Sequence, residues 1–315
     1  MDMKLLQIFT TVVHTGSISA AARQLSFSQP AVSQYIKSIE REVGTQLFTR
    51  DGGHLQITAA GQLLFKHAED IASNWRFVCR QIQSVGHRTD VSRLHVAVFP
   101  SCKPIMVDAV RSMLRNDPLL RIQISEAEPP GNIDLLRTSQ CDVLVSFKHG
   151  DEALPRGYRS IPVLTESYVL LLPTDHPLAG NDVVSLADCM HEQWIGGCPR
   201  CSKELVETCL EHGFDPEIVC STDDLEATSY FTAAGVGIAL RPALNMLARS
   251  LDGIAAVRVD DAIMRHVAVL ARTSDTSSYP EILADLLRGA TRRLVMDLPE
   301  HHRRLFTIAT DEAAA

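Results

Sequence analysis

The sequence lacks any apolar run near the ~20 residues that a membrane-spanning helix needs. Its longest apolar stretch, around Tyr168 to Pro173, has the length of a strand. It also lacks a basic N-terminal stretch followed by an apolar core and a cleavage site, so no signal peptide is expected. These two absences predict a protein that stays in the cytoplasm and has no membrane partner.

Motifs of common enzyme classes are also missing. The chain has no phosphate-binding glycine loop, nucleophile elbow or metalloprotease helix. We therefore predict no catalytic residue, no metal site and no cofactor, and we expect the protein not to be an enzyme. Its 45% hydrophobic and 22% charged residues are typical of globular domains, which excludes disorder, collagen and low-complexity repeats. At roughly 100 to 200 residues per domain, the 315 residues predict two or three domains.

Positive charge is scarce over the chain as a whole. Thirty Lys and Arg against 38 Asp and Glu give a formal net charge of −8, which taken alone argues against a nucleic-acid partner. The charge is unevenly divided, however, because residues 1–90 hold nine Lys and Arg and seven Asp and Glu. The acidic excess therefore belongs to the rest of the chain. DNA binding by the N-terminal region is not excluded, although its non-specific affinity should be modest.

The first 60 residues carry the pattern of short helices. Ser17 and Ser28 are suited to cap two of them, and Pro30 is tolerated in a first turn. Two short helices joined by a tight turn form a helix-turn-helix, and a polar helix front fits the major groove of DNA. The alternative is a small helical subdomain with a solvated face. The polar front of the helix after Ser28 carries Gln29, Ser33, Gln34, Lys37 and Arg41.

Residues 49–57 predict a β-hairpin with a Gly-Gly tip. A hairpin beside a helix-turn-helix forms a wing, in which Arg50 and His54 would face phosphate or a minor groove. The predicted DNA-binding domain thus spans residues 1–58.

Residues 59–88 predict a long helix that begins after Thr58. Apolar residues recur along it at alternating intervals of four and three, which is the seam of a coiled coil over three heptads. An intermolecular seam predicts a homodimer that presents two recognition helices to two half-sites. The alternative is a helix packed on its own domain. The predicted seam is Leu64, Ala68, Ile71, Trp75, Val78, Ile82 and Val85.

Beyond residue 92 the pattern changes to alternating strands and helices. Such alternation predicts βαβ units and a parallel sheet. Two similar runs follow one another, which indicates two α/β lobes with a cleft between them.

The N-terminal motifs resemble those of the LysR-type transcriptional regulators, in order and in spacing, and two later motifs agree more loosely. The motifs are Gly16 to Leu25, Ser28 to Gln34, Ile39-Glu40, Gly44 to Phe48, Arg50 and Thr58 to Gly61, then Pro173 to Leu178 and Ala234 to Pro242. The resemblance implies a winged helix-turn-helix, a dimer formed by the linker helix, and an effector domain of periplasmic-binding-protein type. It also implies a tetramer that bends promoter DNA and changes the bend when a small molecule enters the cleft.

The resemblance also implies domain boundaries and DNA contacts. The effector domain would span residues 92–300, with lobe I formed by 92–164 and 267–300, lobe II by 165–266, and a tail at 301–315. Gln34 stands where many relatives have arginine. The predicted contacts with double-stranded DNA are Arg23, Ser28, Gln29, Pro30, Ser33, Gln34, Lys37, Arg50 and His54.

Two strand-to-helix turns, residues 99–104 and 196–202, predict the effector site. Ligands of open α/β sheets bind at the carboxyl ends of strands, and helix N-termini favour anions. Lys103 and Arg200 add positive charge, so we expect an anionic effector such as a carboxylate. The alternative is that Ser101 only caps a helix and the cations are solvated. The predicted effector contacts are Ser101, Cys102, Lys103, Phe147, Cys198, Arg200 and Ser202.

Cys198 and Cys201 form a Cys-x-x-Cys motif that the family pattern does not require. Thiols at a helix N-terminus are reactive, which permits a reversible disulfide sensor. A soft metal is a second possibility, although no second Cys-x-x-Cys motif or suitably spaced His pair accompanies the first. An ordinary loop that contains two cysteines is the third.

The sequence therefore predicts a DNA-binding transcriptional regulator controlled by a small anionic effector. Two alternatives remain open. One is a redox- or metal-responsive regulator that uses Cys198 and Cys201, and the other is an oligomeric ligand-binding protein that does not bind DNA.

Overall fold

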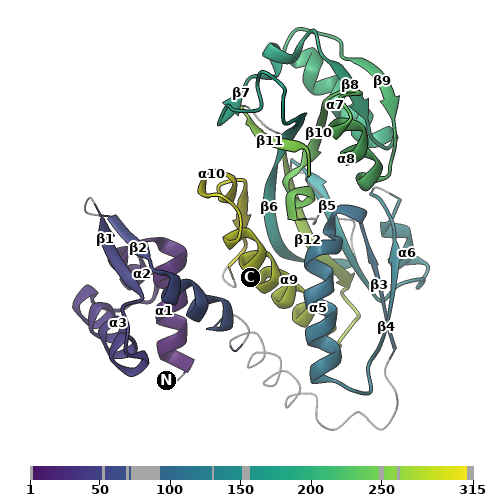
Figure 1. Ribbon diagram of the computed structural model, residues 1–315. Helices are drawn as coiled ribbons and strands as arrows, with labels where there is room; N and C mark the ends of the chain where they lie inside the picture. Colours follow the sequence, from purple (N-terminus) through teal and green to yellow (C-terminus); the bar gives the residue numbers. More distant parts are fainter. Residues whose placement is uncertain are drawn as a thin grey trace. The chain divides into compact units, whose positions relative to one another are not determined.

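The computed structural model describes residues 3–51, 54–68, 71, 93–129, 131–150, 157–247, 252–260 and 263–310. The chain divides into two compact units, residues 1–88 and residues 89–315 (Figure 1). Within the described residues, no helix is both long and apolar enough to cross a membrane.

The first unit begins with three helices: α1 (Met3–Thr15), α2 (Ile18–Gln24) and α3 (Gln29–Val43). The two predicted caps are confirmed. The side-chain oxygen of Ser17 accepts the N–H of Ala20, and that of Ser28 accepts the N–H of Ala31, each at 3.4 Å. The apolar sides of the helices meet in a core that contains Ile8, Phe9, Val12, Ala21, Val32, Ile36 and Ile39.

The predicted wing hairpin is confirmed. Strands β1 (Phe48–Asp51) and β2 (His54–Ile57) pair antiparallel, and the Gly-Gly tip lies outside the described residues. The Glu40 carboxylate of α3 accepts the backbone N–H of Leu47 at 2.9 Å. The wing is therefore tied to α3 where it begins.

A helix over residues 59–68 follows the wing. Thr58 caps it, because its hydroxyl accepts the N–H of Gly61 at 3.0 Å. A Cβ added at Gly61 would lie 2.3 Å from the carbonyl oxygen of Leu47. This close approach between helix and wing requires glycine.

The second unit is built on a mixed sheet of order β4-β3-β5-β12-β6-β11-β7, with β10 and β13 also paired to β6. Its strands are β3 (Arg93–Val98), β4 (Arg121–Glu126), β5 (Val143–His149), β6 (Tyr158–Pro173), β7 (Val183–Val184), β10 (Ala239–Pro242), β11 (Ile254–Val259), β12 (Met264–Arg272) and β13 (Phe306–Ile308). Two further strands, β8 (Gln193–Gly196) and β9 (Glu217–Ser221), pair with each other. The helices are η1 (Pro100–Cys102), α5 (Lys103–Asn116), α6 (Ile133–Arg137), η2 (Leu186–Cys189), α7 (Pro199–Glu211), α8 (Leu225–Ala233), η3 (Ala243–Leu247), α9 (Tyr279–Met296) and α10 (Glu300–Arg303).

The expectation of a parallel sheet was wrong for much of this unit. Strand β3 is parallel to β4 and β5, but β12, β10, β11 and β13 all run antiparallel to β6. The reason is that the chain passes from one lobe to the other along β6 and comes back along β12, so these two central strands run in opposite directions.

Strand β6 belongs to both lobes (Figure 1). It pairs with β12 from Tyr158 to Ser167, and with β10 and β11 from Tyr168 to Pro173. We use lobe I for the part built on β3, β4, β5 and β12, and lobe II for the part built on β7 to β11. The pairing register of β12 with β6 shifts between Val267 and Ala268. This position is next to the predicted boundary between the lobes at residues 266 and 267.

The segment predicted to be a tail is partly folded into lobe I. Strand β13 pairs antiparallel with β6, and Leu305 and Phe306 are buried. The expectation of a separate tail from residue 301 is therefore corrected, because apolar side chains within it join the sheet.

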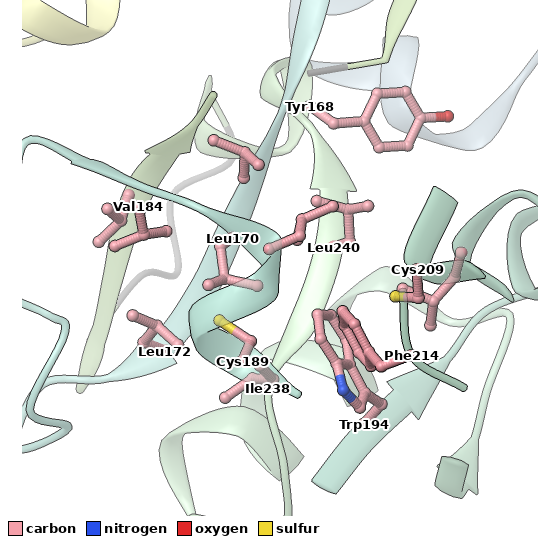
Figure 2. Packing of buried hydrophobic residues seen from close by; sticks show 14 residues of the cluster. Tyr168, Leu170, Leu172, Val184, Cys189, Trp194, Cys209, Phe214, Ile238 and Leu240 are labelled. Carbon is pink, nitrogen blue, oxygen red and sulfur yellow. The ribbon is translucent and has the colours of Figure 1, made fainter. Parts of the chain in front are cut away.

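Lobe II has an apolar core centred on Trp194 of β8, which has no exposed surface (Figure 2). The ring of Phe214 lies 6.3 Å from that of Trp194. The core holds β6, β8, β10 and α7 together and so fixes the position at which α7 begins. Its other buried members are Tyr168, Leu170, Leu172, Val184, Leu186, Cys189, Leu205, Cys209, Ile238, Leu240, Val257 and Val259.

Candidate DNA-binding face and effector site

The polar side of α3 faces solvent. Its apolar side is buried through Val32, Ile36 and Ile39, so the helix presents one face to the core and the other outward. The predicted DNA contacts at Arg23, Ser28, Gln29, Pro30, Gln34, Lys37 and Arg50 are exposed, and that at Ser33 is half-buried. The side chain of His54 lies outside the described part of the structure.

A small cation–aromatic cluster supports the turn before α3. The ammonium of Lys4 lies 5.0 Å from the ring centre of Phe27 and 5.4 Å from that of Tyr35. The cluster ties the start of α1 to the turn and to α3, which fixes the angle at which α3 is presented. Lys4 was not predicted from the sequence, because its contacts with Phe27 and Tyr35 depend on the fold.

The predicted dimer seam is only partly described. Leu64 is half-buried and Ile71 is 46% exposed, whereas Ala68 has no exposed surface. The seam prediction for Ala68 is therefore corrected, because a side chain without exposed surface is not available to a second subunit. The seam positions Trp75, Val78 and Ile82 lie outside the described residues.

The first predicted effector turn is largely buried. Cys102 has no exposed surface, and burial raises the pKa of its thiol. The Lys103 ammonium points to solvent and pairs with Glu126 at 2.8 Å. Cys102 is therefore enclosed in the core, whereas Lys103 lies at the surface.

Ser101 instead takes part in a buried ion-pair network. Its hydroxyl accepts a hydrogen bond from Arg265 at 2.6 Å, and Arg265 also donates to the Glu166 carboxylate at 2.6 Å. The guanidinium of Arg265 lies 4.4 Å from the ring centre of Phe147 and 4.8 Å from that of Phe99. Burial opposes the charge on Arg265, but Glu166 outweighs that effect and the pKa of Arg265 is raised.

The N-terminal turn of α7 meets side chains of lobe I. Glu204 of α7 lies 3.0 Å from the ring nitrogen of His149 at the end of β5, and it accepts a hydrogen bond from Arg200 at 3.0 Å. Arg200 also lies 5.3 Å from the ring centre of Phe147. Burial alone would raise the pKa of Glu204, but His149 and Arg200 outweigh it, so its pKa is lowered. The structure brings Phe147 and Arg200 together, and their contact with an effector stays a prediction.

Ser202 closes the turn that precedes α7. Its hydroxyl donates to the carbonyl of Gly197 and accepts the N–H of the same residue, each at 3.1 Å. Both described partners of the Ser202 hydroxyl are within the turn, and its contact with an effector stays a prediction.

Cys198 and Cys201 face each other across the first turn of α7. Their Sγ atoms are 3.3 Å apart, and the sulfur of Cys198 accepts the backbone N–H of Cys201 at 3.5 Å. Both side chains are half-buried. A Cβ added at Gly197 would lie 2.7 Å from Cβ of Cys201, so glycine is required beside the pair.

The two thiols have opposite acidities. The hydrogen bond that Cys201 donates lowers the pKa of Cys198 to about 6, and the backbone N–H groups of Cys201 and Arg200 contribute to the decrease. The same hydrogen bond, together with burial, raises the pKa of Cys201. The hydrogen bond therefore favours a single negative charge in the pair, on Cys198.

A buried arginine lies next to this pair. Arg241 of β10 is 4% exposed and donates to the carbonyls of Leu240 and Gly196 and to the hydroxyl of Thr228. Within the described residues, no carboxylate forms an ion pair with it. Burial lowers the pKa of Arg241, and the charges that oppose this effect are those of Cys201, Tyr168 and Cys198.

Several charged residues of this interior were not predicted from the sequence. Three of them, Glu166, Arg241 and Arg265, share the signal of an ionisable residue inside an apolar strand, as in Leu164-Thr-Glu166-Ser-Tyr-Val-Leu170 and Ala239-Leu-Arg241-Pro242. Such residues are buried only when paired. The missed residues are Glu128, His149, Glu166, Glu204, Arg241 and Arg265. Among the described residues, no group of three or more His, Cys, Asp or Glu could hold a metal ion.

Comparison with family models matches both units. Residues 3–62 match the model described as bacterial regulatory helix-turn-helix protein, lysR family. Residues 87–292 match the model described as LysR substrate binding domain. The second match alone spans more than half of the chain.

Individual relatives agree. The chain is 25% identical over 246 residues to the HTH-type transcriptional regulator XapR of Escherichia coli, with 76% of this chain and 81% of the relative covered. It is 27% identical over 261 residues to the DNA-binding transcriptional dual regulator OxyR of the same organism, with 81% and 83% covered. A solved structure of a Corynebacterium glutamicum OxyR C206 mutant has a similar fold, with a TM-score of 0.57, 22% identity, and 94% and 93% of the two chains covered.

Proposed function

Because the chain belongs to the LysR family of transcriptional regulators, we propose that it binds double-stranded promoter DNA through the polar side of α3 and the wing. The observation that supports these contacts is the outward face of α3, where exposed amide and cationic side chains stand opposite a buried apolar stripe. Amides and cations at helical spacing match base edges and phosphates of a major groove. We propose a regulatory and not a catalytic role, in the cytoplasm where the DNA is.

The test is a gel-shift assay with the intergenic DNA upstream of the protein's own gene. A variant with Gln29→Ala, Ser33→Ala, Gln34→Ala and Lys37→Ala should lose specific binding, because base contacts supply the specificity. Arg137→Ala, on the exposed surface of the other unit, is the control and should bind as the parent does. Unchanged binding by the fourfold variant would refute the proposed face.

For the assembly, we propose a homodimer formed through the linker helix, which pairs into a tetramer. Ile71 supports the dimer, because it lies on the seam and is 46% exposed. Ile71→Glu should produce monomers in sedimentation at micromolar concentration, as should Trp75→Glu. Leu63→Glu is a matched control, since Leu63 is 61% exposed but lies off the seam. A dimer that persists in both seam variants would contradict the proposal.

For the effector, we propose a small anion bound between the lobes near the start of α7. Arg200, Arg241 and Arg265 supply positive charge there, and only Arg200 is more than slightly exposed. A panel of small carboxylates, each compared with its uncharged amide, can be screened by thermal unfolding of the full chain. A carboxylate at 100 times its Kd should add about 2.7 kcal/mol of stability, and its amide should add little. Equal shifts from acid and amide throughout the panel would exclude an anionic effector.

A further inference from the structure

Among the residues that the structure describes, no carboxylate pairs with the guanidinium of Arg241. Arg200 is paired with Glu204, and Arg265 is paired with Glu166. Arg241 is more deeply buried than Arg200, and its described hydrogen bonds go to two carbonyls and one hydroxyl, which are all neutral. A buried guanidinium is costly unless an anion stands near it.

The thiol pair lies beside Arg241 through Cys201, and the sulfur of Cys198, on which the pair favours the negative charge, is 3.3 Å from that of Cys201. A Cβ at Gly197 would lie 3.6 Å from Sγ of Cys201 and 3.7 Å from a terminal nitrogen of Arg241. The sulfur and the guanidinium therefore flank the same small volume. Cys198, which carries the shared negative charge, is also the residue whose sulfur accepts the N–H of Cys201 in the first turn of α7. If this hydrogen bond were absent, the N–H of Cys201 would be one of the groups at the start of α7 that can donate to an external anion.

We propose that Cys198 and Cys201 form a reversible intramolecular disulfide, and that its formation removes the internal anion of Arg241 and so raises the affinity of this site for an external anion. The proposal rests on the proposed function, since it makes the anionic effector site redox-dependent. In the reduced protein the Cys198 thiolate occupies the electrostatic position of the effector. In the oxidised protein the two sulfurs are neutral, and the charge of Arg241 is left for the effector.

The geometry suits disulfide formation. The sulfurs are 3.3 Å apart and need to approach by only about 1.3 Å to reach the length of a disulfide. The residues lie three apart at the start of one helix, so the bond closes within a single turn. Because Cys198 is half-buried and not enclosed, a small reagent can reach it.

The oxidant that we propose is a low-molecular-weight disulfide. The Cys198 thiolate attacks one of its sulfurs, the small disulfide bond breaks, and one small thiolate leaves and takes a proton from solvent. Cys201 then gives up its proton and attacks the sulfur of Cys198, which breaks the mixed disulfide and releases the second small thiol. In sum, the protein pair loses two electrons and the one proton of Cys201, solvent supplies the second proton, and the small disulfide is reduced to two thiols.

The first experiment tests the disulfide. The full-length protein is equilibrated with reduced and oxidised glutathione at a series of ratios, the free thiols are alkylated, and the peptide with Cys198 and Cys201 is examined by mass spectrometry. The expected result is a loss of two hydrogens from that peptide as the ratio becomes oxidising, with return on reduction. Persistent glutathione on Cys198, or no reaction, would overturn the proposal. Cys220→Ser, another half-buried cysteine, is the control and should leave the transition unchanged.

The second experiment tests the coupling to anion binding, with inorganic sulfate as the probe and chloride at equal ionic strength as its control. Thermal unfolding should give a sulfate Kd that is roughly tenfold lower for the oxidised protein than for the reduced one, within the range of coupled sites. Cys198→Ser removes the thiolate and should bind sulfate as the oxidised protein does. Cys201→Ser retains it and, in buffer without oxidised glutathione, should bind sulfate as the reduced protein does.

Equal sulfate affinities for the reduced parent and Cys198→Ser would overturn the coupling. Neither measurement contains DNA, and gel shifts of the reduced protein test DNA binding separately. A failure of the proposed switch and a failure of the proposed DNA-binding function are therefore distinguishable.

Discussion

The guanidinium of Arg265 and the carboxylate of Glu166 form a hydrogen-bonded ion pair of 2.6 Å, in which both side chains are almost completely buried. Arg265 lies on β12 and Glu166 on β6, the two strands that join the lobes. The other Glu166 oxygen accepts the backbone N–H of Leu244 at 2.6 Å. The pair thus connects both crossing strands to the segment that follows β10.

Loss of this pair should be among the more damaging single changes in the chain. Glu166→Gln leaves the charge of Arg265 buried without an anion, which typically costs about 3 to 5 kcal/mol. Urea unfolding of the full-length protein measures the loss. Asp134→Asn, in the exposed pair with Arg137, is the control and should change little. Similar losses in the two variants would show that Glu166 contributes no more than a surface acid.

DNA affinity should depend on salt through Lys37. If this exposed side chain of α3 contacts a phosphate, Lys37→Ala should weaken binding to all sequences and lower the slope of log affinity against log salt by about one for each copy on the DNA. Gel shifts at several salt concentrations give the slope. Arg137→Ala removes the same charge from the second unit and should leave the slope unchanged. An unaltered slope for Lys37→Ala would place this residue away from the phosphates.

Alkylation of Cys198 should begin at unusually low pH. Its thiolate is the reactive form, and its pKa of about 6 predicts that the rate rises with pH and reaches half its maximum near that value. Cys201→Ala removes the donated hydrogen bond and should move the midpoint upward, whereas Cys201→Ser retains a donor and should move it less. Rates are followed with iodoacetamide on the peptide that contains Cys198. A midpoint that Cys201→Ala does not alter would contradict the assigned hydrogen bond.

Burial should protect three other thiols under the same conditions. It raises the pKa of Cys141 to about 11 and the pKa values of Cys189 and Cys209 to about 12 each. Their peptides should remain unmodified at neutral pH in the folded protein and react after unfolding in urea. Rapid alkylation of any of them in the native state would contradict this packing.

The junction between wing and linker should not tolerate a side chain at Gly61. Gly61→Ala places a methyl group against the Leu47 carbonyl and should cost roughly 1 to 3 kcal/mol, as overpacking does. Gly180→Ala is the matched control, because a Cβ there meets nothing within 4 Å. Thermal unfolding followed by circular dichroism compares the two. If the two variants were equally stable, the junction would accommodate a methyl group at Gly61 and the predicted clash with Leu47 would be wrong.

Local signals predicted the first unit well and the second unit less well. Caps at Ser17 and Ser28 and the Gly-Gly hairpin depend on neighbouring residues, so they could be found in the sequence. The antiparallel pairing of β6 with β12 joins residues about a hundred positions apart. Hydrophobic periodicity depends on neighbouring residues, so it does not predict which distant strands pair. Element order alone therefore suggested a parallel sheet.

The interior site was predicted in part for the same reason. Arg200 in the first turn of α7 lies near Phe147 towards the end of β5, and the strand-to-helix pattern identifies both element ends. Arg241 and Arg265 lie within strands, where periodicity predicts only burial. The hydrogen-bond and ion-pair partners of these two arginines lie on other elements, so the contacts could be identified only in the folded structure.

The sixteen residues of β6 have a mechanical consequence. Because one unbroken strand carries hydrogen bonds in both lobes, the lobes cannot swing on a flexible loop, and relative movement must be torsion spread along β6 and β12. The pairing of β12 with β6 shifts register between Val267 and Ala268, which interrupts the backbone hydrogen bonds between the two strands. The strands should therefore twist most easily at this position. The effector domain should therefore respond elastically, with a small and graded rotation that grows with occupancy of the site.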